Sequence, residues 1–199
     1  DYIVKLIDSM DVDIIALQEI GNKTDLNNLV ENLEGWKGEY ASDNYGYGLA
    51  YLYKTELIVN SLYEINELDN YNLTRTPFLL EINWAGENIY IINNHYKCCG
   101  NGIIEIEYDD EEYRRQQANL LLEEYINNNF ADKNVIILGD LNDEIQEEEA
   151  NNVFWNFISK PDEYLFADIE IAMGDTNYWS WPGWSSNYSA THLMHILIS

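Results

Sequence analysis

The 199-residue sequence has few basic residues, few prolines and only two cysteines. Lys and Arg number 10 against 36 Asp and Glu, which gives a formal net charge of −26. Such a charge repels polyanions at long range and therefore disfavours nonspecific binding of long nucleic acids. An acidic surface is also typical of solubility alone, so the charge excludes one class of binding without selecting another.

The two cysteines, Cys98 and Cys99, are adjacent, so the sequence lacks a disulfide framework and cannot form a zinc site of four thiolates. The pair indicates either a strained vicinal disulfide or two partly buried thiols, because a bridge between neighbouring residues has unfavourable geometry. The sequence also lacks the run of roughly 20 apolar residues that a transmembrane helix needs. We therefore expect a soluble protein, secreted or cytoplasmic, and the cysteines do not decide between these compartments.

The apolar content is sufficient for one buried core. Hydrophobic residues make up 46% of the chain and aromatic residues 14%, which fits a single domain over residues 1–199. The chain starts inside a helical pattern, without a methionine or a signal peptide, and stops in an apolar run typical of a strand. We expect a monomeric domain that is incomplete at both ends.

Hydrophobic periodicity predicts strands interleaved with helices. The close spacing of the strands between residues 47 and 96 requires antiparallel pairing, since parallel neighbours need a long crossover. We therefore expect an α/β (α+β) fold, a four-layer αββα sandwich of two mixed β-sheets flanked by helices. The predicted helices span residues 3–10, 24–34 (capped by Thr24 or Asp25), 110–128 and 150–158, and the predicted strands span 12–19, 47–54, 56–65, 77–84, 88–96, 134–143 and 193–199.

Polar side chains stand at the ends of three apolar runs. The stretch VIILGDLND, residues 135–143, places Asp140 and Asn142 two residues apart, so on a strand both point to one face while the leucine between them points into packing. Glu19 ends a second apolar run and His95 ends a third. Each residue alone fits a turn or a hydrogen-bonded structural role. Their joint occurrence predicts a site where strand ends converge.

The segments DIIALQEI, IINNHYK, RRQQANLL and VIILGDLND, in that order and spacing, resemble the endonuclease/exonuclease/phosphatase superfamily, which has the deoxyribonuclease I-like fold. The resemblance extends over nearly the whole chain. It implies that the full-length parent protein is a metal-dependent phosphodiester hydrolase, most readily an endonuclease-like phosphodiesterase, and it leaves the activity of residues 1–199 alone open. The implied substrate is a phosphodiester, either a nucleic acid or the headgroup of a phospholipid such as sphingomyelin.

The resemblance also implies a role for each residue at the strand ends. Glu19 would bind a divalent cation, Mg²⁺ or alternatively Mn²⁺ or Ca²⁺, and His95 would contact the scissile phosphate. Asp140 would position the attacking water, and Asn142 would donate a hydrogen bond to a phosphate oxygen. These residue types suit the roles, because hard cations prefer oxygen ligands and phosphoryl transfer gains mainly from positioning and charge stabilisation.

Three arginines are candidates for phosphate binding or for ion pairing. Arg75, in the stretch RTPF, matches a position where the family often has a basic residue, and a guanidinium can bind a phosphate through two bonds. The alternative for Arg75 is a surface role or pairing with a helix. Arg114 and Arg115 are instead expected to pair with acids of the run EIEYDDEE, residues 105–112.

Met194 departs from the family pattern. The closing segment THLMHILIS resembles a family stretch in which an aspartate at this place supports the catalytic histidine, and a thioether cannot accept a strong hydrogen bond. The alternative function is therefore a catalytically impaired binding domain of the same fold. His192 and His195 are possible substitutes, but strand alternation turns His195 away from Met194, so we predict structural roles for both histidines.

Overall fold

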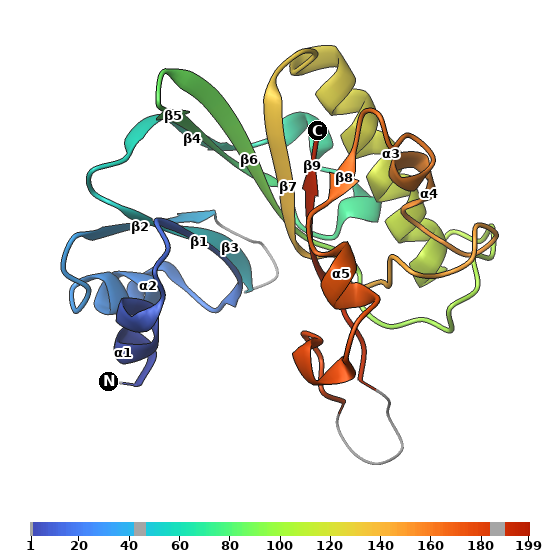
Figure 1. Ribbon diagram of the computed structural model, residues 1–199, viewed down its shortest axis with the longest axis horizontal. Coiled ribbons are helices and arrows are strands. Elements are labelled where there is room, and N and C mark those ends of the chain that lie inside the picture. Colours follow the sequence, from blue (N-terminus) through green and yellow to red (C-terminus); the bar gives the residue numbers. More distant parts are fainter. Residues whose placement is uncertain (1, 42–46, 184–189) are drawn as a thin grey trace.

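Two β-sheets with helices on their outer sides make up the computed structural model, which describes residues 2–41, 47–183 and 190–199 (Figure 1). The sheets contain three and six strands, and side chains of β1 and β3 in the smaller sheet approach β6 and β7 in the larger one. The predicted αββα sandwich is therefore confirmed. The larger sheet is mixed and the smaller one is antiparallel in its described strands.

The smaller sheet has the strand order β1-β3-β2, with β1 at Ile14–Ile20, β3 at Gly48–Lys54 and β2 at Trp36–Ala41. Each neighbouring pair is antiparallel. The sequence-based prediction missed β2, because a lysine, a glycine and a glutamate interrupt its apolar pattern. The strand is held by pairing with β3, whose side chains are almost all buried.

Two short helices cover the outer face of this sheet: α1 at Tyr2–Ser9 and α2 at Lys23–Val30. The predicted cap of α2 was wrong. Asn22 is the N-cap, and its side-chain oxygen accepts a hydrogen bond from the backbone N–H of Asp25 at 2.9 Å, so the helix begins before the predicted caps. The core under these helices consists of buried Ile7, Leu26, Leu33, Trp36, Ala50 and Leu52.

The larger sheet has the strand order β4-β5-β6-β7-β9-β8. Strands β6 and β7 run parallel, as the long crossover between them permits, and the other pairs are antiparallel. The two-residue strand β8 was not predicted, since it is too short to show a period. The bounds are β4 Ile58–Glu64, β5 Phe78–Trp84, β6 Glu87–His95, β7 Asn134–Asp140, β8 Leu165–Phe166 and β9 Met194–Ile198.

The crossover between β6 and β7 contains the long helix α3, Glu111–Asn129, which covers the outer face of the larger sheet (Figure 1). The predicted helix over 150–158 shortens to α4, Trp155–Ile158, because the Asn152 side chain engages nearby backbone groups in turns. None of the helices in the described ranges has the length and apolar content needed to cross a bilayer. The remaining elements are α5 Ile169–Ala172, η1 Asn66–Leu68, η2 Tyr71–Leu73 and η3 Thr176–Tyr178.

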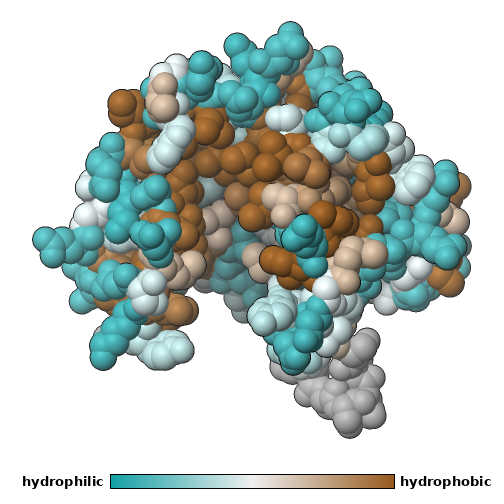
Figure 2. Space-filling view, in the orientation of Figure 1, coloured by the Kyte–Doolittle hydropathy of each residue, from teal (hydrophilic) through white to brown (hydrophobic). Residues whose placement is uncertain are grey.

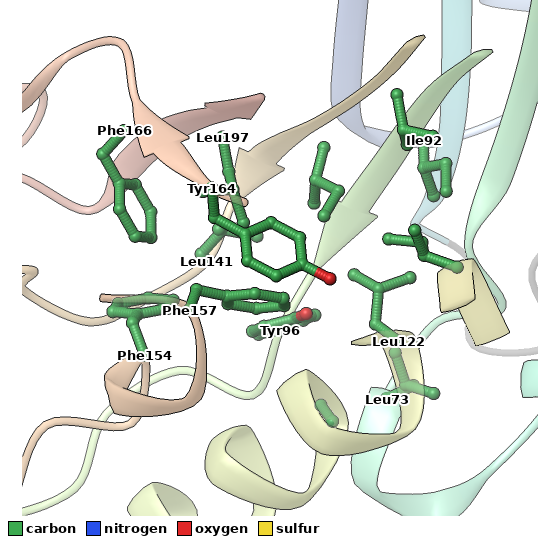
Figure 3. Packing of buried hydrophobic residues seen from close by; sticks show 14 of the residues in the cluster. Leu73, Ile92, Tyr96, Leu122, Leu141, Phe154, Phe157, Tyr164, Phe166 and Leu197 are labelled. Atoms are coloured by element: carbon green, nitrogen blue, oxygen red, sulfur yellow. The ribbon is translucent and has the colours of Figure 1, made fainter. Parts of the chain in front are cut away.

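The core between the larger sheet and α3 fixes the ends of β6 and β7. Figure 3 shows Tyr96 and Leu141 packed among aromatic and aliphatic side chains from α3, α4 and the neighbouring strands. Both residues are almost completely buried, and they directly follow His95 and Asp140. The Tyr96 hydroxyl also hydrogen-bonds Asn119 of α3 at 3.0 Å. The polar residues at the strand ends are therefore held by buried neighbours, as the prediction for the leucine after Asp140 required.

The opposite face of the larger sheet is covered over only part of its width. At β5 and β6 it packs on β3, where Tyr51 donates hydrogen bonds to the carbonyls of Phe78 and Ile91. Across β7 the side chains are only partly buried against the smaller sheet, those of β9 on this face are exposed, and Figure 2 shows hydrophobic residues exposed between the two sheets. We call this surface the open face; it comprises Ile136, Leu138 and Asp140 of β7 and, paired with them, Ile198, Ile196 and Met194 of β9.

Candidate active site

The parallel pairing of β6 and β7 brings His95 and Asp140 together. The two residues are direct neighbours in register, and His95 Nε2 lies 3.9 Å from Asp140 Oδ2. The glycine of the GD pair is required for this approach, because Gly139 has φ +133° and a Cβ there would lie 2.0 Å from the carbonyl oxygen of Asn94. The sequence prediction that these strand ends converge is therefore supported by the register.

Asp140 is an unusual carboxyl group. Its pKa is raised to about 6, mainly by burial. The negative charge of Glu19 acts in the same direction, whereas the hydrogen bond from the Asn142 backbone N–H and the charge of His195 lower the pKa. Its side chain nevertheless keeps 28% of its surface exposed. Asp140 can therefore exchange protons near neutral pH while remaining accessible to a small molecule.

Glu19 faces Asp140 from the other sheet. It sits in an irregular part of β1, where the pairing with β3 shifts register between Leu17 and Ile20, and it has φ +57°. A local bulge of this kind re-aims a side chain, and Glu19 is exposed at the end of its strand. The negative charge of Glu19 is one of the causes that raise the pKa of Asp140, after burial.

Asn93 ties the two sheets together beneath these carboxylates. This asparagine is completely buried, its Oδ1 accepts a hydrogen bond from Gln18 Nε2 at 2.7 Å, and its Nδ2 donates to the carbonyl of Leu17 at 3.0 Å. Nδ2 also lies 3.2 Å from the carbonyl of Ala50. Sequence reasoning missed Asn93, although a buried asparagine inside an apolar strand was a signal for such a link.

Asn142 lies beside Asp140, but not because of strand alternation. Strand β7 ends at Asp140, and Asn142 follows in a turn with φ +55°. Its backbone N–H donates to Asp140 Oδ1 at 3.3 Å, and its Nδ2 donates to the carbonyl of Tyr96 at 3.0 Å. An amide NH₂ group has a second donor, so Asn142 retains the capacity to bind an acceptor oxygen.

Arg75 lies near the same end of the larger sheet, because β5 starts at Phe78 and Phe78 pairs with Asn93. Its Nε donates to the carbonyl of Tyr47 at 2.9 Å, and it lines a hollow of about 390 Å³ with Arg114. Arg114 stacks over the ring of Tyr71 at 3.8 Å instead of pairing with residues 105–112 as expected. Phosphate binding by Arg75 stays a prediction.

Arg115 is a buried support for the loop that follows His95. Its Nε pairs with Asp143 Oδ2 at 2.8 Å, and its Nη2 lies 3.4 Å from Glu112, which belongs to the acidic run expected to pair with it. Its Nη1 donates to the carbonyls of Lys97 and Cys99, both at 2.8 Å. One guanidinium thus links the segment after β6 to the segment after β7.

Asp168, His192 and His195 form a buried hydrogen-bonded network on the face of the larger sheet opposite to the Asp140 side chain. His195 pairs in register with Gly139, its Nδ1 lies 2.6 Å from Asp168 Oδ2, and its Nε2 lies 2.8 Å from the carbonyl of Asp143. A carbonyl oxygen and an ionised carboxylate only accept hydrogen bonds, so both ring nitrogens of His195 lie next to acceptors. The predicted structural role of the two histidines fits this network.

The protonation of the other two members follows from the same contacts. Burial raises the pKa of Asp168, but the hydrogen bonds from His195 and from the Ile196 N–H lower it further, to below the ordinary value. His192 Nδ1 accepts from the Ser180 N–H at 3.3 Å, so Nε2 carries the proton that it donates to Asp168 at 3.0 Å. Burial and the charge of His195 lower the pKa of His192, so its ring is neutral.

Met194 pairs directly with Asp140 across β7 and β9, on the open face, while His195 points to the opposite face. The prediction that these two side chains face opposite ways is confirmed. The thioether is partly exposed beside the Asp140 carboxylate and cannot replace a carboxylate as an acceptor.

Three groups of described residues have donor atoms suitable for a metal ion, and one of them, Asp110, Glu111 and Glu112 at the start of α3, contains no candidate site residue. Glu19 and Asp140 offer the carboxylate oxygens that Mg²⁺ and Ca²⁺ prefer, and a bound cation would favour the ionised form of Asp140, whose pKa is raised by burial and, to a smaller extent, by the charge of Glu19. The ligand atoms of Asp168, His192 and His195 lie within 4.8 Å of one another, a set typical of zinc. Hydrogen bonds already engage these three residues, so Glu19 and Asp140 fit a hard divalent cation better.

Two further hollows in the described part of the chain are lined by candidate residues. Glu19 lines a hollow of about 400 Å³ together with residues of α1 and α2. Asn142 lines another hollow of about 220 Å³ with Cys99 and Asp143. His95 and Asp140 lie where β6 and β7 end, and Asp140 accepts a hydrogen bond from the Asn142 N–H.

Comparison with known proteins identifies the family of this chain. The model of the Endonuclease/Exonuclease/phosphatase family matches residues 1–196. No curated protein matches the sequence. The family match extends over almost the entire chain, in agreement with the resemblance carried by the four sequence segments.

Solved structures with the same fold share little sequence. Truncated TDP2 from Caenorhabditis elegans has a TM-score of 0.69 and 18% identity, and the match covers 100% of this chain and 75% of that one. A longer structure of C. elegans TDP2 is covered over 58% of its length. The human Nocturnin catalytic domain has a TM-score of 0.69 and 18% identity, with 99% and 73% coverage. D. rerio TDP2 complexed with single strand DNA product has a TM-score of 0.71 and 14% identity, with 99% and 73% coverage.

Proposed function

The chain belongs to the endonuclease/exonuclease/phosphatase family, and on this premise we propose that it hydrolyses phosphodiester bonds with the help of a divalent cation. The observation that carries the proposal is the Asp140 carboxyl group, which contacts His95, interacts with Glu19 and has a pKa of about 6. Such a group is accessible and titrates near neutral pH, as a residue that handles the attacking water must.

Each residue has a role that its contacts support. Glu19 holds the cation, Mg²⁺ or alternatively Mn²⁺ or Ca²⁺, with Asp140 as the neighbouring oxygen donor. When bound, the cation offsets negative charge on the phosphate oxygens. Asp140 accepts a hydrogen bond from the attacking water and orients it, and His95 donates to a phosphate oxygen.

Two further residues bind the phosphate in this proposal. Asn142 uses the amide N–H that remains after its bond to the Tyr96 carbonyl. Arg75 adds a positive charge at the same end of the larger sheet. Donors aimed at the phosphate stabilise the charge that develops during the reaction, which is the main protein contribution to phosphoryl transfer.

The substrate we favour is a short single-stranded nucleic acid. The D. rerio TDP2 structure contains a single strand DNA product, which supports nucleic acid as the substrate class. The net charge of −26 disfavours long polyanions, so a short strand fits this surface better than duplex DNA. The headgroup of a phospholipid such as sphingomyelin is the competing substrate.

The test is a hydrolysis assay of the chain on short DNA and RNA strands, sphingomyelin and phosphoinositides, with Mg²⁺ and with a chelator. We expect cleavage of a nucleic-acid strand that stops in chelator. Glu19→Gln and Asp140→Asn should each lower kcat/KM by about 10²-fold or more. The matched control is Glu87→Gln, at the other end of β6 from His95, which should leave the rate unchanged. Turnover that persists in chelator would contradict the proposal.

Met194 supports a second candidate, an impaired domain that binds its ligand without efficient hydrolysis. It lies beside Asp140, where the family resemblance implies an aspartate. Met194→Asp separates the two candidates. A rise in rate within the range of about 10²- to 10⁴-fold supports impairment, because that is the usual contribution of general-base chemistry. A substantial rate that Met194→Asp leaves unchanged supports an enzyme that needs no carboxylate there.

A further inference from the structure

Cys98 and Cys99 form a pair of exposed thiols on the segment that follows β6, three and four residues after His95. Their sulfur atoms lie 2.9 Å apart, and the Cys99 thiol donates to the Cys98 sulfur. They are the only two cysteines of the chain. Two thiols in mutual contact and open to solvent have the arrangement that intramolecular oxidation needs.

The backbone around the two sulfurs is held in place. Arg115 Nη1 donates to the carbonyls of Lys97 and Cys99, at 2.8 Å each. The next residue, Gly100, has φ +111°, and a Cβ there would lie 2.2 Å from a carboxylate oxygen of Glu112. The buried arginine and the close approach of Glu112 thus fix the segment from below while the thiols face solvent.

We propose that Cys98 and Cys99 are a reversible thiol-oxidation site, at which a small soluble disulfide converts the two thiols into a vicinal disulfide. The Cys98 thiolate attacks one sulfur of the small disulfide and displaces the other half as a thiolate, which takes up a proton. Cys99, after losing its proton, attacks the Cys98 sulfur and displaces the second half. The protein loses two electrons and two protons, and the small disulfide is reduced to two thiols.

The contact between the sulfurs assigns the order of attack. The hydrogen bond from Cys99 to Cys98 engages the proton of the Cys99 thiol. In agreement, this hydrogen bond and then burial raise the pKa of Cys99. Cys98 is therefore the attacking thiol and Cys99 the resolving thiol.

The bond would be easily reduced. Neighbouring residues joined by a trans peptide have Cα atoms about 3.8 Å apart, closer than the usual disulfide range of about 4.4–6.8 Å. A strained and exposed disulfide has a more oxidising potential and belongs to the labile class, not the structural one. The segment also reaches the candidate active site, because Arg115 links the Cys99 carbonyl to Asp143, next to Asn142.

The test treats the reduced chain with glutathione disulfide and measures free thiols and intact mass. We expect both thiols to disappear, the mass to fall by two hydrogens, and the protein to stay monomeric on a non-reducing gel, all reversed by dithiothreitol. The matched variants Cys98→Ser and Cys99→Ser each keep one thiol, so they should instead retain a glutathione adduct. Persistent glutathione adducts or crosslinked dimers of the unmodified chain would overturn the proposal.

A second readout uses phenylarsine oxide, a trivalent arsenical that binds two thiols at once. We expect one arsenical per chain and a loss of affinity of about 10-fold or more in either serine variant, because the second sulfur binds intramolecularly. Equal binding by the unmodified chain and the variants would show that the sulfurs do not act together. Neither readout depends on phosphodiester hydrolysis, so failure of the proposed function would leave this test intact.

Discussion

The two faces of the larger sheet differ most at β9. On the closed face, toward α3 and α4, Leu197 is 1% exposed and His195 joins the buried network with Asp168. On the open face, the adjacent Ile196 is 44% exposed. One strand thus has an interior on one side and an uncovered apolar surface on the other.

Residues that stabilise the fold and residues proposed for chemistry therefore lie on different faces of the larger sheet. The closed face contains the packed core and the ion pair, whereas Asp140 and Met194 belong to the open face, opposite Glu19 of the smaller sheet. A surface that stays accessible between two sheets can admit a substrate. Substitutions on the closed face should therefore reduce stability, and substitutions on the open face should affect accessible chemistry or association.

The largest effect is expected for Asp168→Asn. The substitution removes the carboxylate that accepts hydrogen bonds from His195, His192 and the Ile196 N–H, and it leaves these buried donors without their charged acceptor. We expect a loss of about 3–5 kcal/mol in the free energy of unfolding at pH 7, measured by urea denaturation. The exposed control Asp162→Asn should change it by less than about 0.5 kcal/mol.

The pH dependence of this effect has a definite sign. The pKa of Asp168 is lower in the folded state than in the unfolded state, so its contribution is present above the ordinary Asp value and is lost as the pH falls through the folded value. The difference between the unmodified chain and Asp168→Asn should therefore be largest at neutral pH and shrink below about pH 4. A difference that grows on acidification would show that the ion pair is not formed.

Leu197→Ala and Ile196→Ala compare the two faces with adjacent residues of one strand. Leu197 belongs to the core cluster and is buried, so its truncation should cost about 2–5 kcal/mol of unfolding free energy. Ile196 is already half exposed, and its truncation should cost less than about 1 kcal/mol. Thermal or urea unfolding measures both. Equal losses would mean that another part of the protein covers the open face in solution.

Asp140→Asn should stabilise the chain while it abolishes the proposed chemistry. Burial raises the pKa of Asp140 from 3.8 to about 6, so the folded state favours the neutral carboxyl; this contribution is present below the ordinary value and is lost as the pH rises through about 6. At pH 7 the variant should be more stable by about 1–2 kcal/mol, after discounting for partial exposure. The gain should vanish near pH 4.

This measurement requires a chelator, because a bound cation would stabilise the Asp140 carboxylate and hide the effect. Asp162→Asn again serves as the exposed control. A variant that is less stable than the unmodified chain at pH 7 would contradict the prediction that burial of the ionised Asp140 carboxylate destabilises the folded state. The prediction therefore tests whether the open face holds its carboxylate at a cost in stability.

The αββα sandwich and the convergence of His95 and Asp140 could be predicted from the sequence. The strands involved are long, and apolar runs that end in polar groups are typical of buried strands. The sequence was insufficient for β2 and β8, where charged residues or short length hide the period. Asn142 was placed beside Asp140 for the wrong reason, since strand alternation stops at Asp140 and a turn takes over.

The residues that sequence reasoning missed are those whose function depends on distant partners. Asn93 bridges to Leu17, and Asp168 binds His195, pairs separated by 76 and 27 residues. Local patterns carry no information about such contacts, because any buried asparagine or aspartate shows the same signal. Met194 is the opposite case, because its departure from the family pattern was visible in the sequence. The structure adds that Met194 pairs with Asp140 and so lies in the candidate site.

The smallest effect on stability is expected for the double substitution Ile196→Thr and Ile198→Thr. Both side chains lie on the open face, both are partly exposed, and threonine keeps the β-branched shape that strands favour. The unfolding free energy should change by no more than about 1 kcal/mol. Concentration-dependent association should fall, because an exposed apolar patch is an interaction surface.

Static light scattering over a range of protein concentrations measures this effect. The matched control is Ile58→Thr on the edge strand β4, which is also exposed but lies apart from the open face, and which should leave association unchanged. Strand β9 is paired on both sides, so the substitution tests side-chain contact and not strand-to-strand pairing. If the control reduced association as much as the double variant, general surface hydrophobicity, and not the open face, would account for self-association.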